Sequence, residues 1–272
     1  MSTSGRMGLT RLREHANERD LAIIRSIRAF KFLTTRHVYE LHFALHASYV
    51  SGIRACTRVL TRLESHRFIT RLPRSVGGTG GGSTSTVWSV GPAGDRLLRS
   101  GSPDQPAGRS RSFEPTLMFL SHTLAIADLR VLLEQHARAG ELELLDVQPE
   151  PHNWRKFTGR SGRLLTLKPD LTTVSAIGDE ELFHFWEVDL GTEPIHRLID
   201  KCRSYQQYYD SGIEQAKTGV FPQVVWLLGD ERRRQRLRQA LSADSSMRND
   251  LFLISTPDRL SGALSSEPAA AN

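Results

Sequence analysis

The sequence predicts an α/β protein built from two domains. A length of 272 residues is about right for two domains of ordinary size. Residues 100–112, SGSPDQPAGRSRS, contain almost no apolar side chain, which is typical of a linker. We therefore expect one domain at residues 18–99 and a second at 113–260, between a flexible N-terminus at 1–17 and a disordered tail at 261–272.

Three helices open the first predicted domain. Apolar residues recur at helical spacing from Glu18 to Phe30, and a second amphipathic segment opens at Thr34. The third helix is expected to begin at a serine that can cap it, Ser48 or Ser51, and to end near His66. Short helices joined by tight connections fit this pattern.

A β-hairpin and a further helix complete the first predicted domain. Residues 68–72 and 86–90 alternate between apolar and polar side chains, as half-buried strands do. The glycine-serine run at 77–85 between them cannot build a core, so we expect a hairpin with a long flexible tip. Pro92 suits the first turn of another helix, which carries Leu97.

The second domain is expected to mix helices and strands. A long helix comes first, and a three-stranded meander follows it before two more helices and two more strands. The predicted helices lie at 115–139, 194–209 and 230–241, and the predicted strands lie at 142–148, 164–176, 182–190, 224–228 and 251–254.

Positive charge is concentrated in the first hundred residues. These hold 16 Arg and Lys against 6 Asp and Glu, a net charge of +10. The remainder holds 20 against 24, a net charge of −4, and the two add to the overall +6. A polyanion is therefore the expected partner of the first domain.

The composition favours a cytoplasmic protein that does not enter a membrane. Hydrophobic residues make up 39% of the chain. No apolar run reaches the roughly 18 residues that a membrane span requires, and Met1–Thr10 lacks the apolar stretch of a signal peptide. Cys56 and Cys202 lie far apart, so we predict neither a disulfide framework nor a Cys-based zinc site.

The run Cys56–Ile69 resembles the third helix and first wing strand of the winged helix-turn-helix domains of bacterial transcription regulators. The resemblance covers residues 18–99 and implies that this domain binds double-stranded DNA, with the third helix in the major groove. Arginines on the exposed stripe of that helix would then reach bases or phosphates. The base-contacting candidates are Arg54 and Arg58, and the phosphate-contacting candidates are Arg62, Arg67, Arg71 and Arg74.

Two other interpretations of this pattern stay open. An arginine stripe on an amphipathic helix can be only a solvated face, and a winged helix can bind protein in place of DNA. The wing, the charge asymmetry and the ordered three-helix pattern together favour DNA.

A geometric argument brings three carboxylates of the second domain together. If the chain turns at Gly178 and Asp179, the numbers of paired residues sum to 357, and Asp170 lies across from Glu187. Side-chain alternation then places Asp189 on the same face as Glu187.

The segments Lys168–Asp170 and Glu187–Asp189 resemble the motif of the PD-(D/E)XK nuclease superfamily, whose fold is the restriction-endonuclease-like α/β domain. The resemblance implies a magnesium site made by Asp170, Glu187 and Asp189, with Asp170 and Glu187 catalytic. Mg²⁺ is the one cofactor that it suggests. Asp189 stands where the superfamily has a lysine, which puts catalysis in doubt.

Lys201 is the first candidate to replace the missing lysine. It opens the sequence KCRSY, which resembles the Gln-x-x-x-Tyr motif of RecB-like members of the superfamily. Lys168 is the second candidate, and Glu134 or Glu150 would add a further ligand. The alternatives are a metal site without catalysis, an inactive relic of the fold, or ordinary carboxylates neutralised by Arg197, Lys201 or Arg203.

The order of these parts is similar to that of the replication-relaxation family of bacterial plasmids and integrative elements. The resemblance also rests on the helix with Leu117, His122 and Asp128, and on Lys201–Tyr209. It implies a DNA-binding accessory protein of plasmid or mobile-element replication or relaxation, with replication or mobilisation proteins as further partners. The alternatives are a metal-dependent endonuclease or nickase that uses Asp170 and Glu187, and a transcription regulator whose second domain senses a signal or dimerises.

Overall fold

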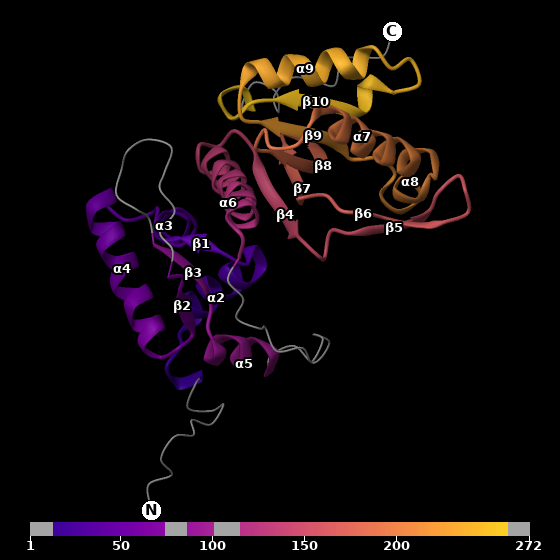
Figure 1. The fold of residues 1–272 in the computed structure, drawn as a ribbon. Coiled ribbons are helices and arrows are strands. Elements are labelled where there is room, and N and C mark those ends of the chain that lie inside the picture. The colour runs from indigo at the N-terminus through magenta and orange to yellow at the C-terminus, as the bar shows by residue number, and fades with distance from the viewer. Residues whose placement is uncertain (1–12, 74–85, 101–114, 261–272) are drawn as a thin grey trace, which may run out of the picture. The chain divides into compact units, whose positions relative to one another are not determined.

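The computed structural model describes residues 13–73, 86–100 and 115–260 (Figure 1). The chain forms two compact units, residues 1–131 and 132–272, each of which is considered by itself. The predicted α/β class is confirmed. Residues 1–12, the predicted wing tip, the predicted linker apart from Ser100, and the predicted tail lie outside the described residues.

Three helices open the first unit as predicted. They are α2 (Glu18–Phe30), α3 (Thr35–His42) and α4 (Tyr49–Ser65). Side-chain caps fix where they begin. The side-chain oxygen of Asn17 accepts the backbone N–H of Asp20, and the hydroxyl of Ser48 accepts the backbone N–H of Ser51. Because these caps are formed by neighbouring residues, the sequence alone predicts the helix starts well.

A small antiparallel sheet in the order β1–β3–β2 belongs to the first unit. Its strands are β1 (Leu33–Thr34), β2 (Ile69–Arg71) and β3 (Val87–Val90). Ile69 pairs with Val90, and Leu33 pairs with Trp88. The hairpin of β2 and β3 confirms the prediction. β1 is not predicted, because two residues are too few to show an alternating pattern.

Helix α5 (Pro92–Ser100) packs closely against neighbouring backbone. A Cβ atom on Gly94 would lie 3.2 Å from Cγ2 of Ile24 and still closer to the carbonyl oxygen of Phe68, so only glycine allows this approach. Asp95 of the same helix is buried and accepts a hydrogen bond from Arg28 of α2. This ion pair fixes α5 to α2.

The core of the first unit includes the beginning of helix α6 (Leu117–Arg138). Leu120 and Leu124 pack against Phe32 and Val87. These contacts extend the first unit past residue 99, where the sequence predicts the first domain to end. Fully buried side chains elsewhere in this unit include Ile23, Ile24, Ile27, Cys56, Leu60 and Leu63.

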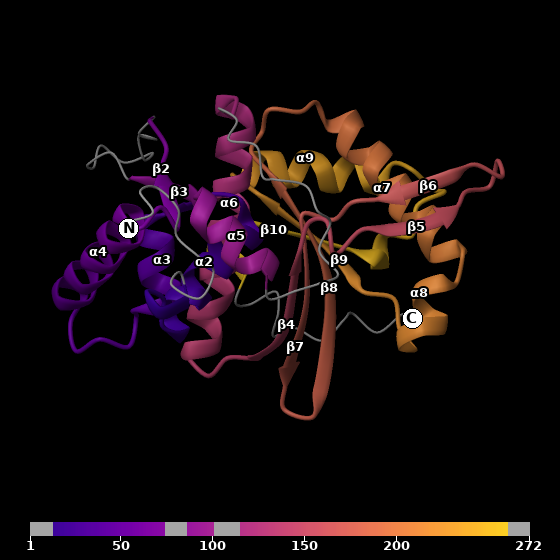
Figure 2. The ribbon, with the colours of Figure 1, turned by 90° about the horizontal axis from the view of Figure 1, so that it is seen from below.

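A five-stranded mixed sheet in the order β10–β9–β8–β7–β4 forms the second unit (Figure 2). Its strands are β4 (Glu143–Pro149), β7 (Leu171–Ile177), β8 (Glu180–Asp189), β9 (Gln223–Leu228) and β10 (Phe252–Ser255). β4, β7 and β8 are antiparallel and form the predicted meander, whereas β9 and β10 are parallel to β8.

A separate two-stranded hairpin lies in sequence between β4 and β7. It consists of β5 (Arg155–Thr158) and β6 (Leu164–Leu167). The prediction of one strand over residues 164–176 is therefore wrong. The chain leaves strand conformation at 168–170, where Pro169 has no backbone N–H to donate, and β7 begins at Leu171. Figure 1 shows β5 and β6 extending away from the five-stranded sheet, near α8.

Three helices and two short 3₁₀ segments complete the second unit. They are α7 (Ile195–Asp210), α8 (Ile213–Thr218), α9 (Glu231–Ser242), and the segments Asn249–Leu251 and Pro257–Arg259. Leu198 and Tyr205 of α7 and Leu237 of α9 share a core with Phe185 and Trp226 of the sheet. Within the described ranges, no helix combines the length and apolarity needed to span a bilayer.

Candidate functional site

Helix α4 presents two arginines to solvent. Arg54 and Arg58 are exposed, on the side of the helix opposite the fully buried Cys56 and Leu60. Neither guanidinium has a hydrogen bond or an ion pair with any part of the chain that the structure describes. Because they lie one turn apart, both side chains leave the same face of α4. This face can therefore offer two uncompensated positive charges to a ligand.

Arg67 is a third exposed arginine, at the junction of α4 and β2. Its φ of 60° lies in the left-handed region. Its N–H donates to the carbonyl oxygen of Glu64 at 2.8 Å, and the N–H of Phe68 donates to that of Leu63 at 2.9 Å, which ends the helix. The guanidinium of Arg67 has no partner among the residues the structure covers.

The other predicted phosphate-contacting arginines are held within the protein or lie outside the described residues. Arg62 donates to the fully buried carboxylate of Asp20 at 2.6 Å. Arg71 pairs with Glu64 at 3.2 Å, and its guanidinium lies 5.2 Å from the centre of the Trp88 ring. Arg74 belongs to the part of the chain that is not described. The predicted set therefore divides into free and paired arginines.

A buried histidine, which the sequence did not single out, links α3 to α6. Nδ1 of His37 accepts the backbone N–H of Thr34 at 3.3 Å, as part of the cap of α3. Nε2 of the ring is therefore left to donate, and it lies 2.8 Å from a carboxylate oxygen of Asp128. No pattern in the sequence could reveal this contact, because the two residues lie far apart along the chain.

The β7–β8 hairpin has the register that the geometric argument predicts. Leu171 pairs with Trp186, so that paired numbers sum to 357, and the N–H of Asp170 donates to the carbonyl oxygen of Trp186 at 3.0 Å. Asp170 thus lies beside Glu187. Its carboxylate accepts the backbone N–H of Val188 at 2.8 Å, which holds it against β8.

Glu187 is the centre of a buried cluster. It is 1% exposed, and its carboxyl accepts hydrogen bonds from Lys201 and, at 2.5 Å, from the hydroxyl of Tyr205. Burial raises the pKa of Glu187 to about 8, and the negative charge of Asp170 adds to the rise. The positive charge of Lys201 acts in the opposite direction and lowers this pKa. Lys201 and Tyr205 lie one turn apart on α7, as the KCRSY motif predicts.

The charge of Lys201 is stabilised by the carboxylates around it. Burial alone lowers the pKa of this lysine, but its contact with Glu187 and the negative charges of Asp170 and Glu150 outweigh burial and raise it above its ordinary value. Glu150, a predicted further ligand, is thus close enough to act on Lys201. Lys168, the second candidate, is exposed and lies over the Trp154 ring instead.

Asp189 has a different partner. It is buried and forms a two-pronged ion pair with Arg233 of α9, one contact of which is 2.9 Å. Arg233 also donates to the carbonyl oxygen of Glu193 at 2.5 Å. Of the predicted neutralising partners Arg197, Lys201 and Arg203, Lys201 contacts Glu187, whereas the partner of Asp189 is Arg233, which the sequence did not indicate.

The predicted magnesium site does not fit this arrangement of donors. Across the described ranges, no group of three or more His, Cys, Asp and Glu side chains is arranged to hold a metal ion. Oxygen atoms of Glu187 are bound by Lys201 and Tyr205, and those of Asp189 by Arg233. A metal ion would have to displace these donors, so we derive no chemistry through Mg²⁺.

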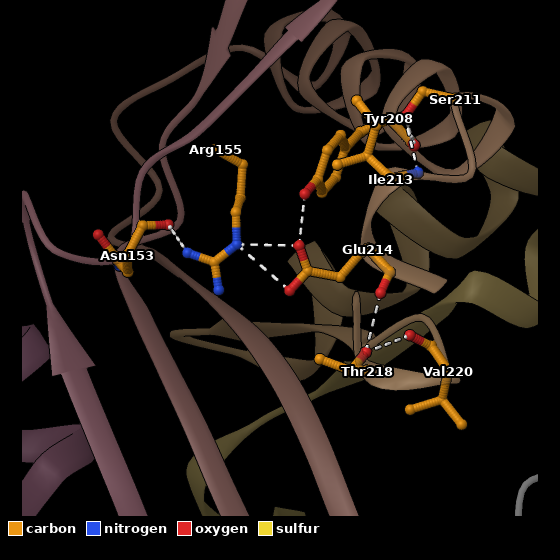
Figure 3. Close-up of polar contacts among 8 residues, drawn as sticks. All are labelled: Asn153, Arg155, Tyr208, Ser211, Ile213, Glu214, Thr218 and Val220. Atoms are coloured by element: carbon orange, nitrogen blue, oxygen red, sulfur yellow. Dashed lines mark hydrogen bonds and ion pairs between the residues drawn. The ribbon is translucent and has the colours of Figure 1, made fainter. Parts of the chain in front are cut away.

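A second polar network anchors the β5–β6 hairpin beside this cluster (Figure 3). Nε of Arg155 lies 3.0 Å from the buried carboxylate of Glu214, which also accepts the hydroxyl of Tyr208. Arg155 donates at 3.0 Å to the carbonyl oxygen of Asn153. The side-chain amide of Asn153 donates at 2.7 Å to the carbonyl oxygen of Pro169. The network therefore fixes the chain immediately before Asp170.

Comparisons with known proteins give one match. The sequence model of a family described as Replication-relaxation matches residues 24–224, which is most of the chain. No curated protein and no solved structure matches the sequence. The matched range runs from α2 to the first residues of β9, so it includes both α4 and the Glu187 cluster.

Proposed function

Because this chain belongs to the replication-relaxation family, we propose that it acts in replication or relaxation of a plasmid or other mobile element by binding duplex DNA through a winged helix-turn-helix in its first unit. Family membership supplies the association with replication and DNA relaxation. The proposal adds the ligand, the domain that binds it and the residues that make the contacts.

The observation that carries the proposal is the pair of unpartnered arginines on the exposed face of α4. Arg54 and Arg58 are exposed while the neighbouring Arg62 is bound to Asp20, so the free charge is confined to one face. A helix of this kind fits the major groove, where an arginine can bond two acceptors of guanine. Arg67 lies where β2 starts and suits a phosphate.

The test is a binding measurement on the full chain with a duplex selected from a random-sequence library. Arg54→Gln/Arg58→Gln should weaken binding to the selected duplex by at least about tenfold, since each lost base contact is worth roughly 1–3 kcal/mol. The matched control is Arg236→Gln/Arg238→Gln on α9, which removes the same charge from two exposed residues. An equal loss in both variants would contradict the proposal.

A second candidate function is strand cleavage by the second unit. It is favoured by one observation, the contact of Lys201 with Glu187 beside Asp170. The test is nicking of supercoiled plasmid in the presence of Mg²⁺ or Mn²⁺. Because the carboxylate oxygens of Glu187 already accept hydrogen bonds from Lys201 and Tyr205, we expect only background nicking. This background should be the same with the natural chain and with Asp170→Asn/Glu187→Gln. Nicking that disappears only in the variant would establish an enzyme.

A further inference from the structure

The β5–β6 hairpin concentrates positive charge in the otherwise acidic second half of the chain. Residues 151–169 include five Lys and Arg but no Asp or Glu, whereas residues 101–272 as a whole carry a net charge of −4. Two of the five cations are paired, Arg155 with Glu214 and Arg160 with Asp210 at 2.6 Å. The side chains of Lys156 and Arg163 have no partner in the described part of the chain.

Strand alternation sorts the side chains of the hairpin onto two faces. Phe157 and Leu167 are each 3% exposed and belong to the core shared with α7 and α9. Lys156 pairs across the ladder with Thr166, and both are exposed on the opposite side. We call the exposed surface of the hairpin the hairpin face. It consists of Lys156, Thr158, Leu164, Thr166 and Lys168 on this side, together with Arg163, which is exposed and directly precedes β6.

The aromatic ring at the edge of the hairpin face is already occupied. Nζ of Lys168 lies 4.3 Å from the centre of the Trp154 ring. This contact holds the lysine against one face of the ring, so a single-stranded base could stack on that face only by displacing the lysine. Ammonium, guanidinium and hydroxyl groups remain as donors, and these are the groups that contact the phosphates of a duplex.

The hairpin is fixed before any ligand arrives. Arg155, Glu214 and Tyr208 tie β5 to the helices (Figure 3). Asn153 ties it to Pro169. A ligand would therefore not have to order the backbone that carries Lys156 and Lys168, and less affinity is lost to ordering.

From these observations we infer that the hairpin face is a second contact with duplex DNA, made to the phosphate backbone and independent of sequence. This inference rests on the proposed function in one respect only, which is that the ligand is duplex DNA. It assigns the second unit a direct part in DNA binding, despite that unit's negative net charge.

The experiment measures how the affinity of the full chain for duplex DNA depends on salt. Lys156→Gln/Arg163→Gln should weaken binding to specific and random duplexes alike. It should reduce the slope of log affinity against log salt by about 1.8, at about 0.9 per lost phosphate contact. Neither side chain has a partner in the described structure, and an unchanged melting temperature will confirm that the variant folds. Arg236→Gln/Arg238→Gln is the charge-matched control.

The outcomes separate this inference from the proposed function. If the hairpin variant loses no more affinity than the control, or loses affinity only for single-stranded DNA, the hairpin face is not a duplex contact. If the hairpin variant behaves as expected while Arg54→Gln/Arg58→Gln binds the selected duplex normally, the inference stands and the winged-helix proposal fails. The reverse pattern would leave the winged helix alone as the DNA contact.

Discussion

Arg58 and Arg62 are the same residue type, one turn apart on α4, yet their surroundings give them different roles. Arg62 reaches the fully buried Asp20, which also accepts the N–H of Asn17 in the cap of α2. Arg58 reaches only solvent within the described structure. The sequence predicts both as DNA contacts because spacing reports the face of a helix, whereas the partner of Arg62 lies on another helix.

Arg62→Ala should lower stability, because it leaves the buried Asp20 without its cationic partner. We expect the free energy of unfolding to fall by about 1–3 kcal/mol, measured by urea denaturation. Arg58→Ala should change stability by less than about 0.5 kcal/mol and should instead weaken DNA binding. A stable Arg62→Ala variant with strongly reduced DNA affinity would show that the contact with Asp20 is incidental.

Glu187 should make stability depend on pH. Its pKa is about 8 in the folded chain and 4.5 when unperturbed, so between these values the folded state binds the proton that the unfolded state has released. Stability should therefore fall as pH rises through this window, by at most about 1.4 kcal/mol per pH unit, and level off above pH 8.

Glu187→Gln is the control, because it cannot ionise and should flatten this slope in urea denaturation. The comparison is cleanest between about pH 6.5 and 8. Burial lowers the pKa of His184 to about 4, and its effect on stability is confined to pH below about 6.5. Identical slopes for the two proteins in that window would mean that Glu187 is ionised in the fold.

Among the elements, α5 shows how closely the first unit is packed. Gly94→Ala would push a methyl group into the carbonyl of Phe68, so we expect a loss of about 1–3 kcal/mol in thermal or urea denaturation. Gly229→Ala is the matched control, since its Cβ would have nothing nearer than the carbonyl oxygen of Asp189 at 4.0 Å. Equal stability of the two variants would show that α5 can move away from β2.

Elements fixed by local signals could be predicted, and those fixed by distant contacts could not. The start of α4 is encoded by Ser48, and the register of β7 and β8 follows from the turn at Gly178. By contrast, β1 exists only because β3 pairs with it, and β5 only because Phe157 reaches a distant core. The candidate site divides in the same way, since Asp170 beside Glu187 was predicted and Arg233 beside Asp189 was not.

At the scale of the whole molecule, the first unit needs part of α6. A fragment of residues 1–131 keeps Leu120 and Leu124, which are 1% and 7% exposed, whereas a fragment of residues 1–100 loses both. The longer fragment should be more stable by about 3–6 kcal/mol, at roughly 1.5–3 kcal/mol for each buried leucine. Within it, Leu120→Ala should destabilise and Leu117→Ala, at a 63% exposed position, should not. Equal melting temperatures for the two fragments would contradict this.

The pairing of Pro149 with Leu171 has a consequence for the order in which the second unit folds. β7 and β8 are joined by a turn of two residues, so their ladder closes almost no loop. β4 can join that ladder only after residues 150–170 have been gathered into a closed loop, which carries a larger entropy loss. β9 and β10 join through crossover helices and so need contacts still more distant in sequence. We therefore expect the β7–β8 hairpin to be the nucleus on which the sheet grows, so that Asp170 and Glu187 meet early, before Arg233 reaches Asp189.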